Sequence, residues 1–412
     1  MKEFISILIS FIFMSLAESV DSFFNNKISI DTIIVCSSLF SINLLARSLG
    51  EIGTYTYRVI RKREFSYLAI TGIVSFIVGL IIFLLRPLLV NLFDISINQK
   101  IMLSNLLALY IMYLPASLVD GGFLEIVRLK NNLKLYRKSL ILFYVLLISF
   151  DLLAFLLTKN LIMLYIATIM AHIINIIYLT IKFKLKRCKI SAEDINNIKK
   201  YGIVLITERL LSRIFILIYG VLASWMGEFK YAVHSICYSV CLNLEIITNA
   251  YSAALMIKIP EAKNKEKQVA SLEEYMKKCF VIILMMNFIL SLVMLIIQHG
   301  SLPIKACFPY IILYSCTVFG LYLYESYKAI CIIQKKPTIL LKGSTIGVIC
   351  RVVVCLLFIK SNINLYIFAI ASFLDFFVRG IYYKNKFNKE TNYENEIIDD
   401  VNPNQNHILE EA

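Results

Sequence analysis

The chain has 412 residues, of which 59% are hydrophobic and only 17% charged, and its formal net charge is +14. Soluble domains contain fewer apolar and more charged residues, so the composition excludes an ordinary soluble protein and indicates a membrane protein. The basic residues lie in short segments between apolar runs and on no compact soluble domain, which argues against nucleic-acid binding.

Twelve apolar runs follow one another along the chain, each roughly 18–25 residues long and therefore able to cross a bilayer as a helix. They lie at residues 4–22, 31–48, 66–86, 101–119, 139–157, 161–181, 201–224, 230–257, 279–297, 303–327, 339–358 and 362–381. With the N-terminus inside, 32 of the 42 lysines and arginines fall in cytoplasmic segments, which include the adjoining span ends, and only seven fall on the outer side. The remaining three, Arg209, Arg213 and Arg351, lie well inside runs. This bias predicts a multi-pass protein of the inner (cytoplasmic) cell membrane with both termini in the cytoplasm.

The runs form two similar halves. Residues 32–48 align with 234–250 at an offset of 202, and residues 149–160 align with 349–360 at an offset of 200. Because six spans are an even number, both halves start on the same side, which predicts a parallel repeat about an axis along the membrane normal. We expect an all-α integral membrane protein with an N-terminal six-helix lobe (1–182), a basic cytoplasmic linker (183–200), a C-terminal six-helix lobe (201–384) and a disordered polar tail (385–412).

Several charged side chains lie inside spans, where an ionisable group usually faces a water-filled path or a partner. Arg209 and Arg213 are four residues apart on one face of the seventh span, so this pair requires an anion or a carboxylate nearby. Either a substrate or the acids Glu245 and Asp375 could supply it. We take the substrate cavity to involve Glu208, Arg209, Arg213, Glu245 and Arg351.

Other polar residues receive structural interpretations. Near the cytoplasmic ends of spans, Asp120, Glu125 and Glu325 are expected to pair with loop lysines. His234 shares a helical face with two cysteines, but three ligands on one helix do not complete a metal site, so we predict no metal and no cofactor. The sequence has no nucleophile–base set and no phosphate loop, so we do not expect an enzyme.

Three stretches resemble the multidrug and toxic compound extrusion (MATE) transporters, whose wider superfamily includes flippases for lipid-linked oligosaccharides. They are VDSFFNNKISIDTI (20–33), YLPASLVDGGFLEIVRLKNNLK (113–134) with its second-half copy YESYKAICIIQKKP (324–337), and GVICRVVVCLL (347–357). The glycines of the family's fourth-helix motif are absent, and Asn25–Asn26 replaces a first-turn glycine. These departures leave the subfamily and the substrate open.

The resemblance implies an ion-coupling site in the N-terminal lobe. Its first-helix aspartate matches Asp21, and the aspartate of an Asn-x-x-x-Asp pattern matches Asp151, although Leu147 stands in place of the asparagine. Glu18 lies one turn from Asp21 and could share its proton. Alternatively, Asp21 caps the first helix, and Asp151 pairs with a cation such as Arg351. We expect the first and seventh spans to line the cleft between the lobes.

Three functions are therefore considered. The first is a monomeric secondary antiporter that exports small organic or drug-like compounds in exchange for protons or sodium. The second is a flippase for a lipid-linked oligosaccharide or polysaccharide precursor, which a cationic lumen would favour. The third is a non-transporting membrane scaffold, against which the paired halves argue. In each case membrane lipids surround the spans.

Overall fold

The computed structural model describes residues 2–186, 188–259, 265–299, 302–358 and 365–401, and all regular structure within them is helical. The side chains of some helical residues, Glu18 and Asp21 among them, lie outside this description. Nine stretches in the described ranges are long and apolar enough to cross a membrane. Large apolar side chains such as Leu84, Leu156 and Leu356 are more than 60% exposed on the outside of the bundle. The chain is an all-α membrane protein.

The N-terminal half contains six spans, two of which are divided into two helices. The helices are α1 (Lys2–Ile28), α2 (Ile30–Gly50), α3 (Ile52–Ile60), α4 (Glu64–Val90), α5 (Ile97–Ala108), α6 (Tyr110–Leu129), α7 (Leu133–Thr158) and α8 (Leu161–Lys182). Capping boxes start α2 at Ser29 and α5 at Ser96, where each hydroxyl accepts from the third helical N–H. Polar caps of this kind fix where the chain re-enters a helix after a short loop.

The C-terminal half follows the same plan after a short linker. Its helices are α9 (Ala192–Asn197), η1 (Ile198–Gly202), α10 (Ile203–Ser224), α11 (Glu228–Lys258), α12 (Lys265–Gln298), α13 (Ile304–Ser315), α14 (Thr317–Ile333), α15 (Pro337–Phe358) and α16 (Tyr366–Val401). The fourth span of each half is divided, into α5 and α6 in the first and into α13 and α14 in the second.

The two halves also end that span in the same way. Asn131 after α6 and Lys335 after α14 both adopt a left-handed conformation, with φ of 58°. One residue later, the N–H of Asn132 bonds the carbonyl of Val127 at 3.1 Å, and the N–H of Lys336 bonds that of Cys331 at 2.9 Å. This six-to-one bond belongs to the Schellman motif, which satisfies the last carbonyls of a helix. The internal repeat is thus visible in backbone geometry.

Helix packing repeats between the halves and across them. In the first half α1 packs on α7, and in the second half the equivalent helices α10 and α15 pack on each other. In the same way, the contact between α6 and α8 is repeated between α14 and α16. Across the halves, α1 packs on α11 and α10 packs on α2. These two contacts exchange when the equivalent helices of the halves are exchanged, as a parallel repeat requires.

The linker helix α9 is tied to the N-terminal half by Asp194, whose side chain is fully buried. Its carboxylate accepts from the Ser66 hydroxyl at 2.7 Å and from the Ser191 N–H at 2.9 Å, and pairs with Arg63 at 2.8 Å. Burial raises the pKa of Asp194, but the hydrogen bonds from Ser191, Ser66 and Arg63 outweigh it and leave the pKa below its ordinary value. The linker therefore docks through a charged carboxylate at neutral pH.

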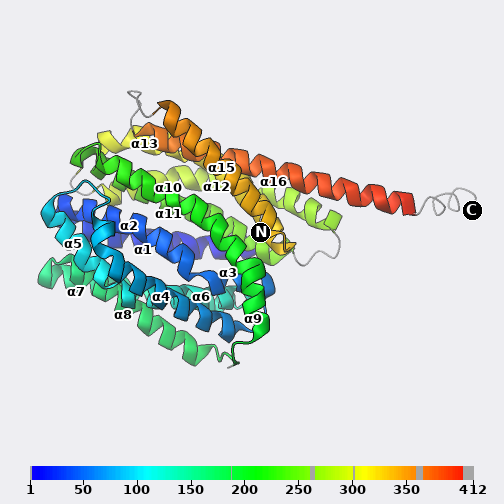
Figure 1. The fold of residues 1–412 in the computed structure, drawn as a ribbon, viewed down its shortest axis with the longest axis horizontal. Coiled ribbons are helices and arrows are strands. Elements are labelled where there is room, and N and C mark those ends of the chain that lie inside the picture. Colours follow the sequence, from blue (N-terminus) through cyan, green and yellow to red (C-terminus); the bar gives the residue numbers. More distant parts are fainter. Residues whose placement is uncertain (1, 187, 260–264, 300–301, 359–364, 402–412) are drawn as a thin grey trace, which may run out of the picture.

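The start of α1, helix α9 and the far end of α16 lie at one end of the bundle (Figure 1). Helix α16 continues to Val401 and projects beyond the other helices (Figure 1), and the disorder that we expected from residue 385 stays a prediction. No proline or glycine occurs between Gly380 and Pro403, so nothing in the sequence stops the helix earlier. Residues 402–412 lie outside the described ranges.

Candidate functional site: a charged cavity in the C-terminal half

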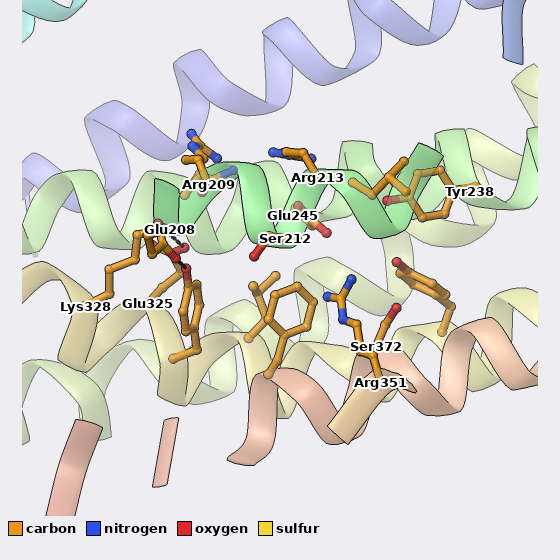
Figure 2. A pocket seen from close by; sticks show the side chains of 16 residues that line it. Glu208, Arg209, Ser212, Arg213, Tyr238, Glu245, Glu325, Lys328, Arg351 and Ser372 are labelled. Carbon is orange, nitrogen blue, oxygen red and sulfur yellow. Dashed lines mark hydrogen bonds and ion pairs between the residues drawn. The ribbon is translucent and has the colours of Figure 1, made fainter. Parts of the chain in front are cut away.

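A small polar cavity of about 50 Å³ lies inside the C-terminal half. Helices α10, α11, α13, α14, α15 and α16 supply its walls, and seven charged side chains face it (Figure 2). The charged residues are Glu208, Arg209, Arg213, Glu245, Glu325, Lys328 and Arg351. A water molecule needs roughly 10–15 Å³ of such space, so the cavity holds a few waters and is far smaller than a pocket for a drug-sized ligand.

Part of this charge is neutralised within the protein. Asp375 on α16 forms ion pairs with Arg351 of α15 and with Arg379, one turn along its own helix. Arg379 is 1% exposed and also donates to the Ser212 hydroxyl of α10 at 2.8 Å. These contacts join α10, α15 and α16 around a carboxylate that two guanidinium groups share, a geometry in which a buried charge is tolerated.

Two glycines on α15 make room for this cluster. A Cβ at Gly347 would lie 1.9 Å from Asp375 Oδ1, and a Cβ at Gly343 would lie 2.1 Å from the Tyr383 ring. Small residues four apart allow membrane helices to approach closely. The spacing of Gly343 and Gly347 therefore allows α16 to bring its ionic side chains against α15.

Glu208 is likewise satisfied. It is 2% exposed, and its carboxylate accepts from the Tyr324 and Ser344 hydroxyls, each at 2.9 Å. The Arg379 guanidinium lies 3.8 Å away and adds a positive neighbour. Figure 2 shows Glu208 on the same side of the cavity as Lys328 and Glu325, which pair with each other at 3.3 Å.

Arg213 and Glu245 differ from these neighbours. In the described part of the chain, neither side chain forms a hydrogen bond or an ion pair, although Arg213 is the cation with the largest electrostatic effect on Glu245. Both lie at the cavity wall, Arg213 on α10 and Glu245 on α11 (Figure 2). Both side chains are half-buried, and a charge partly withdrawn from water without a direct partner is costly, so this pair is available to bind a ligand or water.

Arg209 faces the cavity and also connects the halves. Its Nε donates to the Tyr55 hydroxyl of α3, which in turn donates to Glu51 at 2.6 Å. Nearby, Arg61 donates to the Met256 carbonyl of α11 at 3.0 Å. These contacts join the halves at the end of the bundle that holds α3 and α9.

The opposite end is joined as well. Gln298 of α12 donates to the Ser19 hydroxyl of α1 at 2.8 Å, and Asn26 donates to the Gln298 carbonyl at 2.8 Å. Gln99 of α5 donates to Asp31 at 2.6 Å and to Glu228 of α11 at 3.5 Å. Hydrogen bonds therefore join the two halves at both ends of the bundle.

A second cavity, of about 140 Å³, lies between the halves and has no charged lining residue within the described ranges. Its polar walls come from serines and asparagines of α1, α2 and α11, with Phe40, Tyr165 and Tyr238 as aromatic walls. Tyr238 lines both cavities, so the two spaces adjoin at this ring.

The residues singled out from the sequence divide between the halves. Glu208, Arg209, Arg213, Glu245 and Arg351 all line the one charged cavity. Asp151 is fully buried on α7 in the other half. Asp21 and Glu18 lie on α1, and their side chains are outside the described residues. Helix α10, the seventh span, lines the charged cavity, and α1, the first span, lines the uncharged cavity that adjoins it at Tyr238. A single cleft shared by the first and seventh spans stays a prediction.

Two expected partners are also corrected. Arg351 pairs with Asp375 in its own half, so it does not serve as the cation for Asp151. Asp120 was expected to meet loop lysines, but its Oδ2 lies 2.8 Å from His172 Nδ1, because α6 packs along α8 at this level.

Glu125 pairs with arginines rather than lysines: Arg128 on its own helix and Arg58 of α3 at 3.0 Å. Glu325 does pair with a lysine, Lys328.

Sequence reasoning missed Arg379, which was counted among the cytoplasmic loop charges. The available signal was its spacing from Asp375, since an acid and a base four residues apart share a helix face. Glu325 and Lys328, three apart, carry the same signal. His172 had no such signal, because its partner lies 52 positions away.

No protein-family model matches the chain, and no curated protein does. Solved structures do. The MATE multidrug transporter DinF-BH, solved as a ligand complex, superposes with a TM-score of 0.74 at 16% identity, covering 92% of this chain and 93% of its own. A MOP superfamily transporter from Pyrococcus furiosus, described as having a binding pocket of reverse polarity, gives 0.72 at 15% identity, covering 94% and 95%.

An inward-facing multidrug resistance MATE family transporter of the MOP superfamily gives a TM-score of 0.67 at 14% identity, covering 93% of this chain and 98% of its own. Each likeness extends over nearly the full length of both chains and includes both halves of the bundle. The chain therefore has the fold of the MATE family transporters of the MOP superfamily.

Proposed function

We propose that this protein is a monomeric secondary transporter of the cell membrane that exports small organic compounds in exchange for protons or sodium. The substrate occupies the charged cavity of the C-terminal half, and the coupling ion binds in the N-terminal half at Asp151 together with Asp21 and Glu18. The observation that carries this proposal is the pair Arg213 and Glu245, two charged side chains at a cavity wall to which the described residues supply no direct partner.

The polarity of the cavity favours a substrate that carries an anionic group. Its lining holds four basic and three acidic side chains. Arg351 and Glu208 are already paired, which leaves Arg213 to meet a substrate anion and Glu245 to meet a substrate cation or donor. A zwitterionic or amphipathic compound satisfies both. The Pyrococcus furiosus neighbour, described as having a pocket of reverse polarity, supports the view that pocket charge differs among transporters of this fold.

Transport requires the halves to separate. The present cavity is too small for an organic substrate, and a handful of hydrogen bonds closes each end of the interface. A typical hydrogen bond contributes only about 0.5–1.5 kcal/mol net, so opening one end costs a few kcal/mol. A ligand that binds one conformation better by that amount is sufficient to shift the equilibrium.

Asp151 is the acid best placed for ion coupling among those with a described side chain. It is fully buried on α7, in the half opposite the substrate cavity. The sequence repeat aligns it with Arg351, so equivalent positions of the two halves carry opposite charges. An acidic N-terminal half attracts a cation, while a more basic C-terminal half attracts an anionic group.

The test uses purified protein in proteoliposomes, with a fluorescent zwitterionic rhodamine dye as the first substrate and imposed proton or sodium gradients. Asp151→Asn keeps the side-chain volume and removes the charge, so gradient-driven transport is lost while equilibrium binding of the dye remains. Arg213→Ala or Glu245→Gln instead reduces binding. Exposed Asp94 and Arg137 provide matched controls, Asp94→Asn and Arg137→Ala. Full gradient-driven transport by the Asp151→Asn protein would refute the coupling assignment.

The flippase remains a second candidate because the uncharged cavity adjoins the charged one at Tyr238. Hydroxyl and amide groups beside aromatic rings suit a sugar, and the arginines suit a phosphate. Proteoliposomes that contain a fluorescent lipid-linked oligosaccharide distinguish the two functions. Translocation that needs Arg213, proceeds without an ion gradient and is unaffected by Asp151→Asn would favour the flippase.

A further inference from the structure

The N-terminal half contains a polar cluster that the proposed transport mechanism does not use. The carboxylate of Asp120 on α6 has both oxygens engaged by α8: Oδ2 lies 2.8 Å from His172 Nδ1, and Oδ1 accepts from Asn175 Nδ2 at 2.7 Å. The Asn175 carbonyl oxygen accepts from the Ser139 hydroxyl of α7 at 2.7 Å. Helix α8 thus binds the carboxylate of α6 directly, and α7 joins the cluster through Asn175.

This cluster is built into the interior of the membrane-spanning region. Asp120 is 1% exposed, and Asn175 and Ser139 are fully buried. His172 lies eleven residues after the start of α8 at Leu161, which is roughly 16 Å along a helix and near the middle of a 30 Å hydrocarbon core. An ionisable pair at that depth is retained at a cost and marks a functional site by default.

Its surroundings hold the imidazole in one orientation. The Phe143 ring of α7 stacks on it at 4.6 Å between centroids, and the Tyr113 ring of α6 meets it edge-on at 6.3 Å. About 12% of the histidine side chain remains accessible. The carboxylate therefore fixes one side of the imidazole ring, and part of the rest of the ring remains accessible.

Corresponding helices of the C-terminal half place an arginine at their contact, with its carboxylate partner Asp375 on α16 as well. There α14 and α16 meet through Arg379, whose guanidinium lies 4.7 Å from the Tyr324 ring. The pair α6 and α8 occupies the same place in the repeat and contains an acid and a histidine instead. An acid in the first half where the second half has an arginine is the same difference that distinguishes Asp151 from Arg351. A site that binds a cation therefore fits the first half.

We propose that Asp120 and His172 form a second proton-binding site, separate from the coupling acids on α1 and α7. In the unprotonated state, the neutral imidazole donates its Nδ1–H to the carboxylate and keeps a lone pair on Nε2. A hydronium ion in the aqueous phase delivers its proton to Nε2 and leaves as water, which gives an imidazolium beside the carboxylate. The net charge of the pair changes from minus one to zero, and no other group gains or loses a proton.

Histidine is the side chain that proteins most often use to bind and release protons at physiological pH, which makes a histidine beside a carboxylate a suitable proton-binding site. The other titratable groups around the pair are Tyr113, Tyr165 of α8 and Tyr144 of α7, whose ring lies 4.8 Å from Phe143. From α2, Arg47 donates to Ser117, one turn before Asp120, at 3.3 Å. Protonation changes the force between this carboxylate and its charged neighbours and thereby the packing of α6 on α8.

The first measurement is independent of transport. The chain has four histidines, so NMR of protein labelled at the histidine ring carbons in lipid nanodiscs gives few signals. The His172 signal is the one lost in His172→Gln, with His299→Gln as a control for assignment. We expect it to shift reversibly between pH 5 and 8, and Asp120→Asn to move the pH at which it does so. A His172 signal that stays constant over this range identifies a fixed structural pair and overturns the proposal.

The second measurement tests the role in coupling. In proteoliposomes, Asp120→Asn and His172→Gln are each expected to slow pH-gradient-driven transport by about 5- to 150-fold, the usual span of coupling energies, and the double variant should lose no more than either single one. Exchange without a gradient should persist. Ser139→Ala removes one hydrogen bond and no titrating group, and should retain coupling. Additive losses, or equal losses of exchange and gradient-driven transport, would show a structural role. If no variant or wild-type protein transports, the proposed function fails, while the NMR result still decides the proton site.

Discussion

Gly347→Ala should dismantle the ionic cluster that shapes the charged cavity. The added Cβ would lie 1.9 Å from Asp375 Oδ1 and 2.9 Å from two atoms of Arg379. Ordinary contact begins near 3.4 Å, so the carboxylate would have to move by about 1.5 Å. That displacement exceeds what its ion pairs with Arg351 and Arg379 tolerate, because charge-assisted bonds need close and aligned atoms.

The expected cost follows from what remains buried after the move. Breaking a buried ion pair costs about 3–5 kcal/mol, and replacing a helical glycine by alanine returns about 1 kcal/mol, so the net loss is about 2–4 kcal/mol. Gly121→Ala is the matched control, because a Cβ at Gly121 would meet nothing within 4 Å. This variant therefore has only the stabilisation that alanine brings to a helix in place of glycine.

Thermal unfolding in detergent, followed by size-exclusion chromatography of the surviving protein, measures the difference. Gly347→Ala should unfold at a clearly lower temperature than wild type, and Gly121→Ala at the same or a higher one. Ligand binding should fall in parallel, because Arg351 lines the cavity. Equal stability of the two alanine variants would mean that α15 and α16 separate at little cost and that the close approach at Gly347 is unimportant.

Three further predictions concern other parts of the chain. Tyr55→Phe removes the hydroxyl that lies between Arg209 and Glu51 and so weakens a contact between the halves. In a protein depleted of its other cysteines, a water-soluble thiol reagent should therefore label a Ser212→Cys variant faster when Tyr55→Phe is also present. An unchanged labelling rate would show that this contact does not close the cavity. Asp194→Ala should lower the free energy of unfolding by about 1.5–3 kcal/mol at pH 7, the value of hydrogen bonds to a charged group. The pKa of Asp194 is lower in the folded than in the unfolded protein, so this stabilisation stays constant from pH 5 to 8. It is lost only as the pH falls below the unfolded-state pKa of about 3.9 and then through the lower folded-state pKa. Denaturation measured at a series of pH values tests this, and a loss of stabilisation between pH 8 and 5 would contradict it. A cysteine introduced at Ala192 should react with impermeant reagents only from the cytoplasmic side, and labelling from outside whole cells would rule out the twelve-span topology.

The sequence by itself determined the class of the protein and much of the charged cavity. Hydropathy and charge bias are local properties of each span, so they predicted twelve spans and two repeated halves without any tertiary information. The five residues from Glu208 to Arg351 were found in the same way, because a charge within an apolar run is visible wherever it points. Their convergence on one cavity was inferred only in outline, since periodicity fixes the face of a helix and not its neighbour.

The tertiary structure decided which charges are already satisfied. Glu208, Arg351 and Arg379 have partners on other helices, whereas Arg213 and Glu245 form no hydrogen bond or ion pair in the described ranges. It also placed Asp120 against His172. Such pairings depend on the rotation and depth at which two helices pack, and these are set by close contacts such as that at Gly347, between segments that are distant along the chain. A single sequence records the side chains that need partners, but only the packed helices determine which partner each one meets.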